Sequence, residues 1–163
     1  MLRDNDNIYS FDELRFFTNI ETLSGLGYCT NLTKLTLPEG GMLRKLGGEC
    51  LYGSALTPVF SVPEGVTTFA NHAIGRGTCM GVNLYLPSTT ATFEGFFMMF
   101  STHIQNIIIK AAIPPAVASN TLPNIPTSVQ FYVPDTALQA YLNDSSWGSY
   151  STRIHPISEY VEA

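Results

Sequence analysis

Short hydrophobic segments recur along the chain at an almost constant interval. Five of them share the order apolar, any residue, apolar, and four of the five are followed by proline. They are residues 35–38, 60–63, 84–87, 107–110 and 131–134. Because side chains alternate between the two faces of a strand, each segment is predicted to be a short strand that buries its first and third residues.

A second hydrophobic row has nearly the same period. It consists of Leu23, Leu46, Phe69, Phe93 and Val117. Two rows in phase indicate an internal repeat of about 24 residues, and such a unit buries its apolar side only by stacking on its neighbours. The pattern therefore predicts a β-rich solenoid of about five coils, in which the prolines end the strands because they lack an N–H.

The repeat also resembles a known family. Residues 29–38 read Cys-x-x-Leu-x-x-Leu-x-Leu-Pro, residues 66–69 read Val-Thr-x-Phe, and the stretch 131–157 is similar to a terminal unit. This pattern resembles the BspA-like, or Treponema-type, leucine-rich repeat of Bacteroides-type surface proteins, over about residues 19–157. The resemblance implies a β-rich α/β solenoid, a leucine-rich-repeat right-handed superhelix with short helical caps. It also implies a non-catalytic role in adhesion to host proteins or neighbouring cells.

Both ends of the chain carry signals for caps. Ser10 and Glu13 fit a capping box for a helix over residues 11–17. Asp135 or Thr136 can begin a helix over about 137–143, after which Trp147 is expected to pack against the last coil near Tyr150. The whole chain, 1–163, is thus expected to be one leucine-rich-repeat domain. Its parts are an N-terminal cap (1–19), the repeats (20–134) and a C-terminal cap (135–163).

Composition and charge argue against two classes of partner. Only 13% of the residues are charged, against roughly 25% in an average soluble domain. The net charge is −5, and the few basic residues are scattered, so no basic stripe for nucleic acid is present. No apolar run approaches the roughly 20 residues that span a bilayer, so membrane insertion is not expected.

The start of the chain does not read as an export signal, although surface members of the family are exported. Met1 is followed by a polar stretch and not by a basic start and an apolar run. Three explanations stay open: a piece of a longer exported protein, a mature form with a new Met1, or a virion protein released by lysis. The expected location is extracellular or at the cell surface, with a virion as the alternative.

The residues suited to catalysis or metal binding are dispersed. Three cysteines form no Cys-x-x-Cys pair, and the three histidines lie at different repeat phases. Glu39 and Glu64 both follow a strand proline, so a hydrolase that uses one of them is a remote alternative. The sequence therefore predicts no enzyme activity, no cofactor and no metal.

The outward-facing positions of the strands are the first candidates for binding. One outward row reads Thr36, Ser61, Tyr85, Ile108 and Tyr132. The flanking row is mostly polar and reads Lys34, Val59, Asn83, Asn106 and Gln130. An exposed isoleucine and two tyrosines exceed what a solvated face needs, and tyrosine is favoured at interfaces. The candidate binding residues are Lys34, Thr36, Tyr85, Ile108 and Tyr132, with ordinary strand surface or contact with a neighbouring domain as the alternative.

These observations favour a non-catalytic module that binds a host or cell-surface protein or glycan. The alternative is a structural or receptor-binding component of a phage virion or fibre. A homo-oligomer or a larger multidomain parent protein is compatible with both. The apolar segment 96–100 is expected to belong to the core, with an oligomer contact as its alternative.

Overall fold

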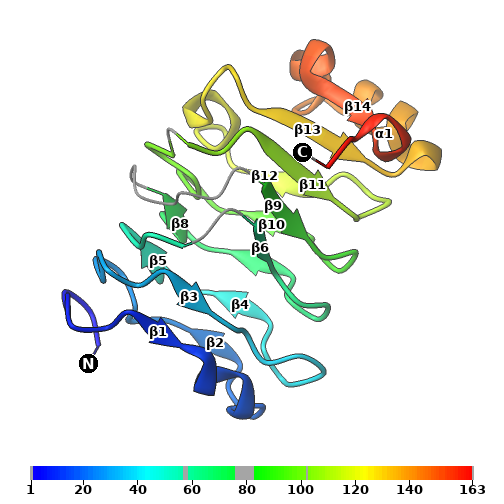
Figure 1. Ribbon diagram of the computed structural model, residues 1–163. Coiled ribbons are helices and arrows are strands. Elements are labelled where there is room, and N and C mark those ends of the chain that lie inside the picture. Colours follow the sequence, from blue (N-terminus) through cyan, green and yellow to red (C-terminus); the bar gives the residue numbers. More distant parts are fainter. Residues whose placement is uncertain (1, 57–58, 76–82, 102, 163) are drawn as a thin grey trace.

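The computed structural model describes residues 2–56, 59–75, 83–101 and 103–162. These residues form four sheets of short strands, and every strand pair in them is parallel. Figure 1 shows the chain rising from the N-terminal strands at the bottom to the helical C-terminal region at the top.

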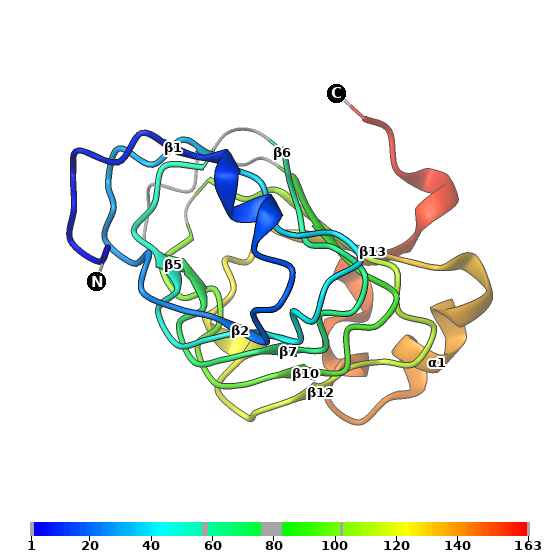
Figure 2. The same ribbon diagram turned by 90° about the horizontal axis from the view of Figure 1, so that it is seen from below.

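Two five-stranded sheets form the body of the molecule and lie on opposite sides of its interior (Figure 2). Sheet I contains, in spatial order, β14 (Ile154–Pro156), β13 (Gln130–Val133), β11 (Asn106–Ile109), β9 (Asn83–Leu86) and β6 (Val59–Ser61). Sheet II contains β12 (Ala116–Val117), β10 (Thr92–Phe93), β7 (Thr68–Phe69), β4 (Lys45–Leu46) and β2 (Thr22–Leu23).

The remaining strands form two pairs, and the helical segments are short. The pairs are β1 (Ser10–Phe11) with β3 (Lys34–Leu35), and β5 (Leu51–Tyr52) with β8 (Ile74–Gly75). The α-helix among the described residues is α1 (Leu138–Asn143). The 3₁₀ helices there are Asp12–Phe16, Leu122–Asn124, Asp135–Ala137, Gly148–Arg153 and Ile157–Glu159.

The strand registers follow the hydrophobic rows of the sequence. In sheet II, all five members of the second row pair in register, from Leu23 to Val117. In sheet I, Phe60 pairs with Leu84, Leu84 pairs with Ile107, and Ile107 pairs with Phe131. These side chains are buried, except for the half-buried Val117, and they form one core between the sheets. The rows therefore identify the residues that pair and point inward.

The expected fold class, a β-rich α/β leucine-rich-repeat superhelix with about five coils and helical caps, is wrong. The described residues form several separate sheets of short parallel strands, and only one short α-helix accompanies them, in the C-terminal region. Connections such as residues 87–91, between β9 and β10, are too short for a helix, and β9 is followed directly by Pro87. The predicted strand row is also interrupted, because β3 pairs with β1 and not with β6.

The N-terminal capping box is wrong as well. Ser10 lies in β1, where it pairs with Lys34, and the helix that follows is a 3₁₀ helix with no side-chain cap. An extended backbone at Ser10 points its hydroxyl away from the N–H groups that it was expected to cap. Of the three apolar residues expected to cover the first repeat, Leu14 is buried, whereas Phe16 and Phe17 are exposed.

The C-terminal region seals the core with Trp147. The expected helix is present as α1, although Asp135 does not cap it. The indole of Trp147 is 1% exposed and donates a hydrogen bond of 2.8 Å to the Pro115 carbonyl. Its ring contacts Phe131 and Tyr141, with centroids 5.5 and 5.4 Å away. Tyr150 lies next to it, as expected, and its backbone N–H donates a hydrogen bond of 2.8 Å to the Trp147 carbonyl. Trp147 therefore covers the end of the core.

The apolar segment 96–100 divides between the core and the surface. Phe97 and Met98 are each 1% exposed and belong to the core, as expected. Phe100, in contrast, is 57% exposed.

The inward and outward positions of β10 give a matched pair of substitutions. Phe93→Ala should lower the free energy of unfolding by about 3–5 kcal/mol, because it leaves a cavity between the two sheets. Thr92→Ala, on the outer face, should change it by less than about 0.5 kcal/mol. Urea unfolding of both variants checks this, and similar losses would contradict the placement of Phe93 in the core.

Candidate functional site

The candidate site is the outer face of sheet I. Tyr85, Ile108 and Tyr132 pair across β9, β11 and β13, and His155 of β14 continues the same row. Their inward neighbours fill the core, so parallel pairing holds these four side chains side by side on the opposite face. Three of the five predicted binding residues are thus brought together.

The C-terminal segment folds back over this row. The ring centroid of Tyr160 lies 4.9 Å from that of Tyr132 and 6.2 Å from that of Tyr85, in edge-to-face arrangements. Ile108 pairs between these two tyrosines and is only 2% exposed, yet it is not part of the core cluster. Ile108 is therefore not the exposed side chain that was expected. It lies between the two tyrosines that the ring of Tyr160 contacts, and we infer that this ring covers it.

Polar contacts also hold the C-terminal segment in place. The Tyr85 hydroxyl lies 3.2 Å from the Tyr160 hydroxyl and 3.3 Å from Oε1 of Glu162. Desolvation, the hydrogen bond to Tyr160 and the charge of Glu162 raise the pKa of Tyr85 above its usual value. The Tyr85 hydroxyl thus stays a neutral hydrogen-bond donor to a more alkaline pH than an ordinary tyrosine. We call Tyr85, Ile108, Tyr132, His155 and Tyr160 the aromatic cluster.

A row of amide side chains borders the aromatic cluster. Asn106 donates a hydrogen bond of 2.9 Å from Nδ2 to Oδ1 of Asn83 on the neighbouring strand. Further along, Oε1 of Gln130 lies 2.9 Å from Nε2 of His155. Val59, which the sequence places in the same row, is 49% exposed. Asn83 is only 6% exposed, so it does not face outward as the sequence predicted, whereas Asn106 and Gln130 are half-buried. Amides offer donors and acceptors together, so these two side chains can bind either peptide groups or hydroxyls.

The other two predicted binding residues lie apart from the cluster. Lys34 belongs to β3 and Thr36 directly follows it, so neither is in sheet I. Both contact Asp12: Lys34 forms an ion pair with Oδ2, and Thr36 donates a hydrogen bond of 2.7 Å to Oδ1. The hydrogen bonds from Lys34 and Thr36 hold the pKa of Asp12 below its usual value. Their role in the structure is to attach the 3₁₀ helix Asp12–Phe16 to β3.

The two carboxylates of the hydrolase alternative flank a groove of about 560 Å³ between β3 and β6. Burial opposes ionisation of Glu64, but hydrogen bonds from the backbone N–H and the hydroxyl of Ser88 outweigh it and hold its pKa below the usual value. A general acid needs the opposite shift. Glu64 therefore does not suit that role.

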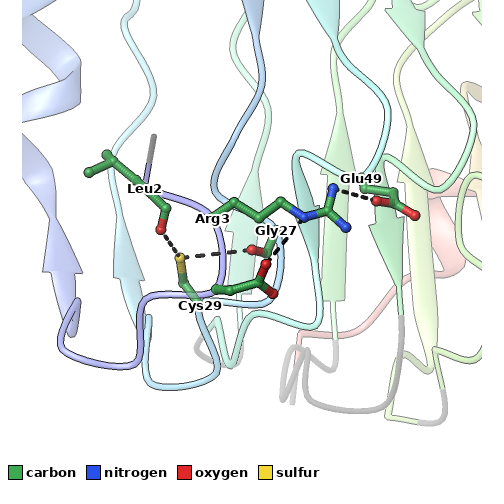
Figure 3. Close-up of polar contacts among 6 residues, drawn as sticks. Leu2, Arg3, Gly27, Cys29 and Glu49 are labelled. Carbon is green, nitrogen blue, oxygen red and sulfur yellow. Dashed lines mark hydrogen bonds and ion pairs between the residues drawn. The ribbon is translucent and has the colours of Figure 1, made fainter.

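The cysteines contribute to packing. Cys29 and Cys50 are both fully buried, and the Cys50 thiol donates a hydrogen bond of 3.5 Å to the Ala73 carbonyl, whereas Cys79 lies outside the described residues. The Cys29 thiol donates a hydrogen bond of 3.1 Å to the Leu2 carbonyl (Figure 3). Next to it, Arg3 pairs with Glu49 at 2.6 Å. These contacts attach the N-terminal segment to the repeats.

The remaining candidates are the histidines and the groups suited to metal binding. Within the described ranges, no three His, Cys, Asp or Glu side chains come together as a metal site. His72 stacks on Phe96, with ring centroids 5.4 Å apart, and His103 is exposed. No described helix has the length and apolarity needed to cross a membrane.

No family model matches the chain, and no curated protein matches its sequence.

Sequence reasoning missed three residues of these surfaces. His155 lies about one repeat after Tyr132, so the period could have placed it in the row. Tyr160 carries no such signal, because it lies out of phase with the repeat and reaches the row from a segment outside the sheet. Asp12 lies in the region expected to be a helical cap, and its contact with β3 depends on the pairing of β1 with β3.

Removal of the Tyr160 ring should uncover Ile108. Tyr160→Ala is expected to lower the free energy of unfolding by about 1–2 kcal/mol, since two edge-to-face contacts are lost. Tyr160→Phe keeps the ring and should cost less than about 1 kcal/mol, because only a hydrogen bond changes. Urea unfolding compares the variants. Equal stability of wild type and Tyr160→Ala would show that the segment does not cover the row.

The Asp12 contacts predict a dependence on pH. A carboxylate whose pKa is lowered by folding stabilises the native state above its unfolded pKa, and this contribution is lost as the pH falls through the folded value. Asp12→Asn should therefore be less stable than wild type at pH 7, and the difference should shrink below about pH 4. Glu13→Gln, at an exposed neighbour, is the control. A difference that persists at pH 2 would contradict the ionic origin.

Proposed function

We propose that the chain is a non-catalytic binding module that recognises a protein or glycan on the surface of a host or neighbouring cell. The observation that carries the proposal is the aromatic cluster on the outer face of sheet I. Tyr85, Tyr132 and Tyr160 are all half-buried. Their rings are held by the sheet register and by one another, so little side-chain entropy is lost when a partner binds.

The surroundings of the cluster suit recognition. Tyrosine presents a large apolar ring together with a polar hydroxyl, which is why it is enriched at interfaces. The amide border adds donors and acceptors at a fixed spacing along the sheet. An aromatic surface beside amides can stack on a sugar ring or pack against a protein side chain.

The repeat pattern supports the same proposal through its resemblance to BspA-like surface proteins, for which adhesion is the typical role. An extracellular or cell-surface location follows from this resemblance as part of the proposal. The alternative, a phage virion or fibre component, predicts a different behaviour. The same face would then contact other copies of the chain or further virion proteins, and no free ligand would bind.

The test is binding of the purified chain to an array of extracellular-matrix proteins and glycans and to intact bacteria. Saturable binding is expected, and Tyr132→Ala should weaken it by at least about tenfold, as for a central interface residue. The matched control is Tyr9→Ala, which removes an exposed tyrosine next to β1, far from the cluster.

Three results would separate the alternatives. Loss of binding in Tyr132→Ala alone supports the proposal and locates the surface. An equal effect of both variants would contradict the assignment of the aromatic cluster. Absence of binding across the array, together with a symmetric assembly in sedimentation velocity, would overturn the proposal in favour of a structural component.

A further inference from the structure

The stack of strands is open on one side, between β3 and β6. Sheet I ends at β6, and β3 pairs only with β1. Most Cα–Cα distances between β3 and β6 exceed 8 Å, whereas paired strands lie about 4.8 Å apart. On the opposite side of the core, β4 pairs with both β2 and β7. The opening is thus confined to one side, while sheet II holds the two halves together.

The opening forms the groove of about 560 Å³ described above. Leu35 and Leu37 line one wall, and Phe60 and Val62 line the other. Leu35 is half-buried, although its counterparts Leu84 and Ile107, which have paired strands on both sides, are 2% and 1% exposed. Leu37, Phe60 and Val62 are buried, so the apolar surface that the missing neighbour of β3 leaves accessible is mainly that of Leu35.

Both walls also direct backbone groups into the groove. Val62 donates its N–H to the Tyr85 carbonyl, so this residue faces β9. Backbone groups alternate in direction along a strand, and Ser61 and Val59 therefore present theirs to the opposite edge. Lys34 donates to the Tyr9 carbonyl, which by the same rule turns the backbone groups of Leu35 and Leu37 toward the groove. Within the described residues, no backbone hydrogen bond joins β3 to β6.

We propose that the groove binds an extended peptide segment of a partner protein as an additional parallel strand between β3 and β6. A single strand between two others needs a separation of about 9.6 Å, twice the ordinary strand spacing. Its backbone would form hydrogen bonds with both walls, and every second side chain would enter the apolar space beside Leu35 and Phe60. This mode is β-strand addition, in which the main chain provides affinity and alternate side chains provide specificity.

The charges at one end of the groove specify which residues the peptide carries after its apolar part. Glu39 and Glu64 come just after the strand prolines, at the carboxyl end of both walls, and both are exposed. Lys110 lines the same end and interacts with Glu64. The guanidinium of Arg44 lies beside Gly41 and Gly65. The net charge of this end is therefore close to zero, and among the described residues Glu39 has no ion-pair partner. A parallel peptide reaches this carboxylate with its own carboxyl end. The preferred segment is therefore apolar, any residue, apolar, followed by lysine or arginine.

This site is separate from the aromatic cluster, and the experiment keeps the two apart. The probe is a fluorescein-labelled peptide, Ser-Val-Thr-Val-Thr-Val-Lys-Lys, measured by fluorescence anisotropy against the purified chain. Saturable binding is expected. The same peptide with N-methyl groups on its central residues should bind at least about tenfold more weakly, because it cannot form the ladder. A version ending in Glu-Glu should also bind more weakly.

Variants of the groove provide the second arm. Ser61→Pro removes the N–H that faces the groove and leaves the bonds to β9, and proline is tolerated on an edge strand. It should weaken peptide binding at least about tenfold, whereas Ser61→Ala, which keeps the N–H, should not. Tyr132→Ala should bind the peptide as wild type does. If the cluster fails to bind a surface ligand, peptide binding is unaffected by that failure.

Three outcomes would overturn the proposal. The first is equal affinity of the N-methylated and unmodified peptides, a result that needs no folded variant. The second is equal affinity of Ser61→Pro and Ser61→Ala when both melt cooperatively. The third is a dimer of the chain that excludes the peptide, because the groove would then be occupied by a second copy.

Discussion

Parallel backbone pairing between segments one repeat apart in the sequence is the interaction on which the rest of this structure depends. Most strands are only two to four residues long, and such strands are not stable alone. They are stable in this structure because side chains alternate between the two faces of each strand. The inward-facing set of every strand is buried in the common core between sheets I and II. Where pairing is complete, as at Leu84 and Ile107, the core is closed. Where it is interrupted, between β3 and β6, a groove with apolar walls remains.

The ends of the chain decide which outer surfaces stay accessible. At the N-terminal end, Asp12 engages Lys34 and Thr36. At the C-terminal end, Tyr160 joins Tyr85 and Tyr132 in one cluster, with Ile108 buried between these two tyrosines. The outward-facing strand residues therefore belong to two separate surfaces. Lys34 and Thr36 are attached to a 3₁₀ helix, whereas Tyr85, Ile108 and Tyr132 belong to the aromatic cluster. The aromatic cluster and the groove are the two surfaces that we propose for recognition.

The hydrophobic period allowed the inward residues and their pairing partners to be predicted, because burial requires apolar side chains at fixed positions in every repeat. The hydrophobic period contains no information on the structure of the segments that connect the strands. The short segment 87–91 excludes a helix, and the extended backbone of Ser10 removes its capping role. These local conditions made the α/β class wrong. The two hydrophobic rows also led us to expect the same pairing between all neighbouring repeats. The longest sequence interval within the strand row, from Leu37 to Val62, nevertheless falls where β3 and β6 do not pair.

The candidate site was predictable only in part, for a related reason. Tyr85 and Tyr132 could be placed on one face because the repeat fixes their register. The burial of Ile108 depends on a segment that is not in phase with the repeat, and no periodic signal reports such a contact. The lowered pKa of Glu64, opposite to that of a catalytic acid, follows from hydrogen bonds of Ser88 and Thr89 in the next repeat and from the charge of Lys110. Local sequence therefore did not determine either property.

The central claim is that pairing is complete between β6 and β9 and absent between β3 and β6. Amide hydrogen exchange measured by NMR tests it residue by residue in the free protein. The Val62 and Lys110 amides, which donate to Tyr85 and Leu86, should be protected, whereas those of Leu37 and Ser61 should exchange rapidly. Protection of Leu37 and Ser61 equal to that of Val62 would mean that the sheet is closed, and it would contradict the account.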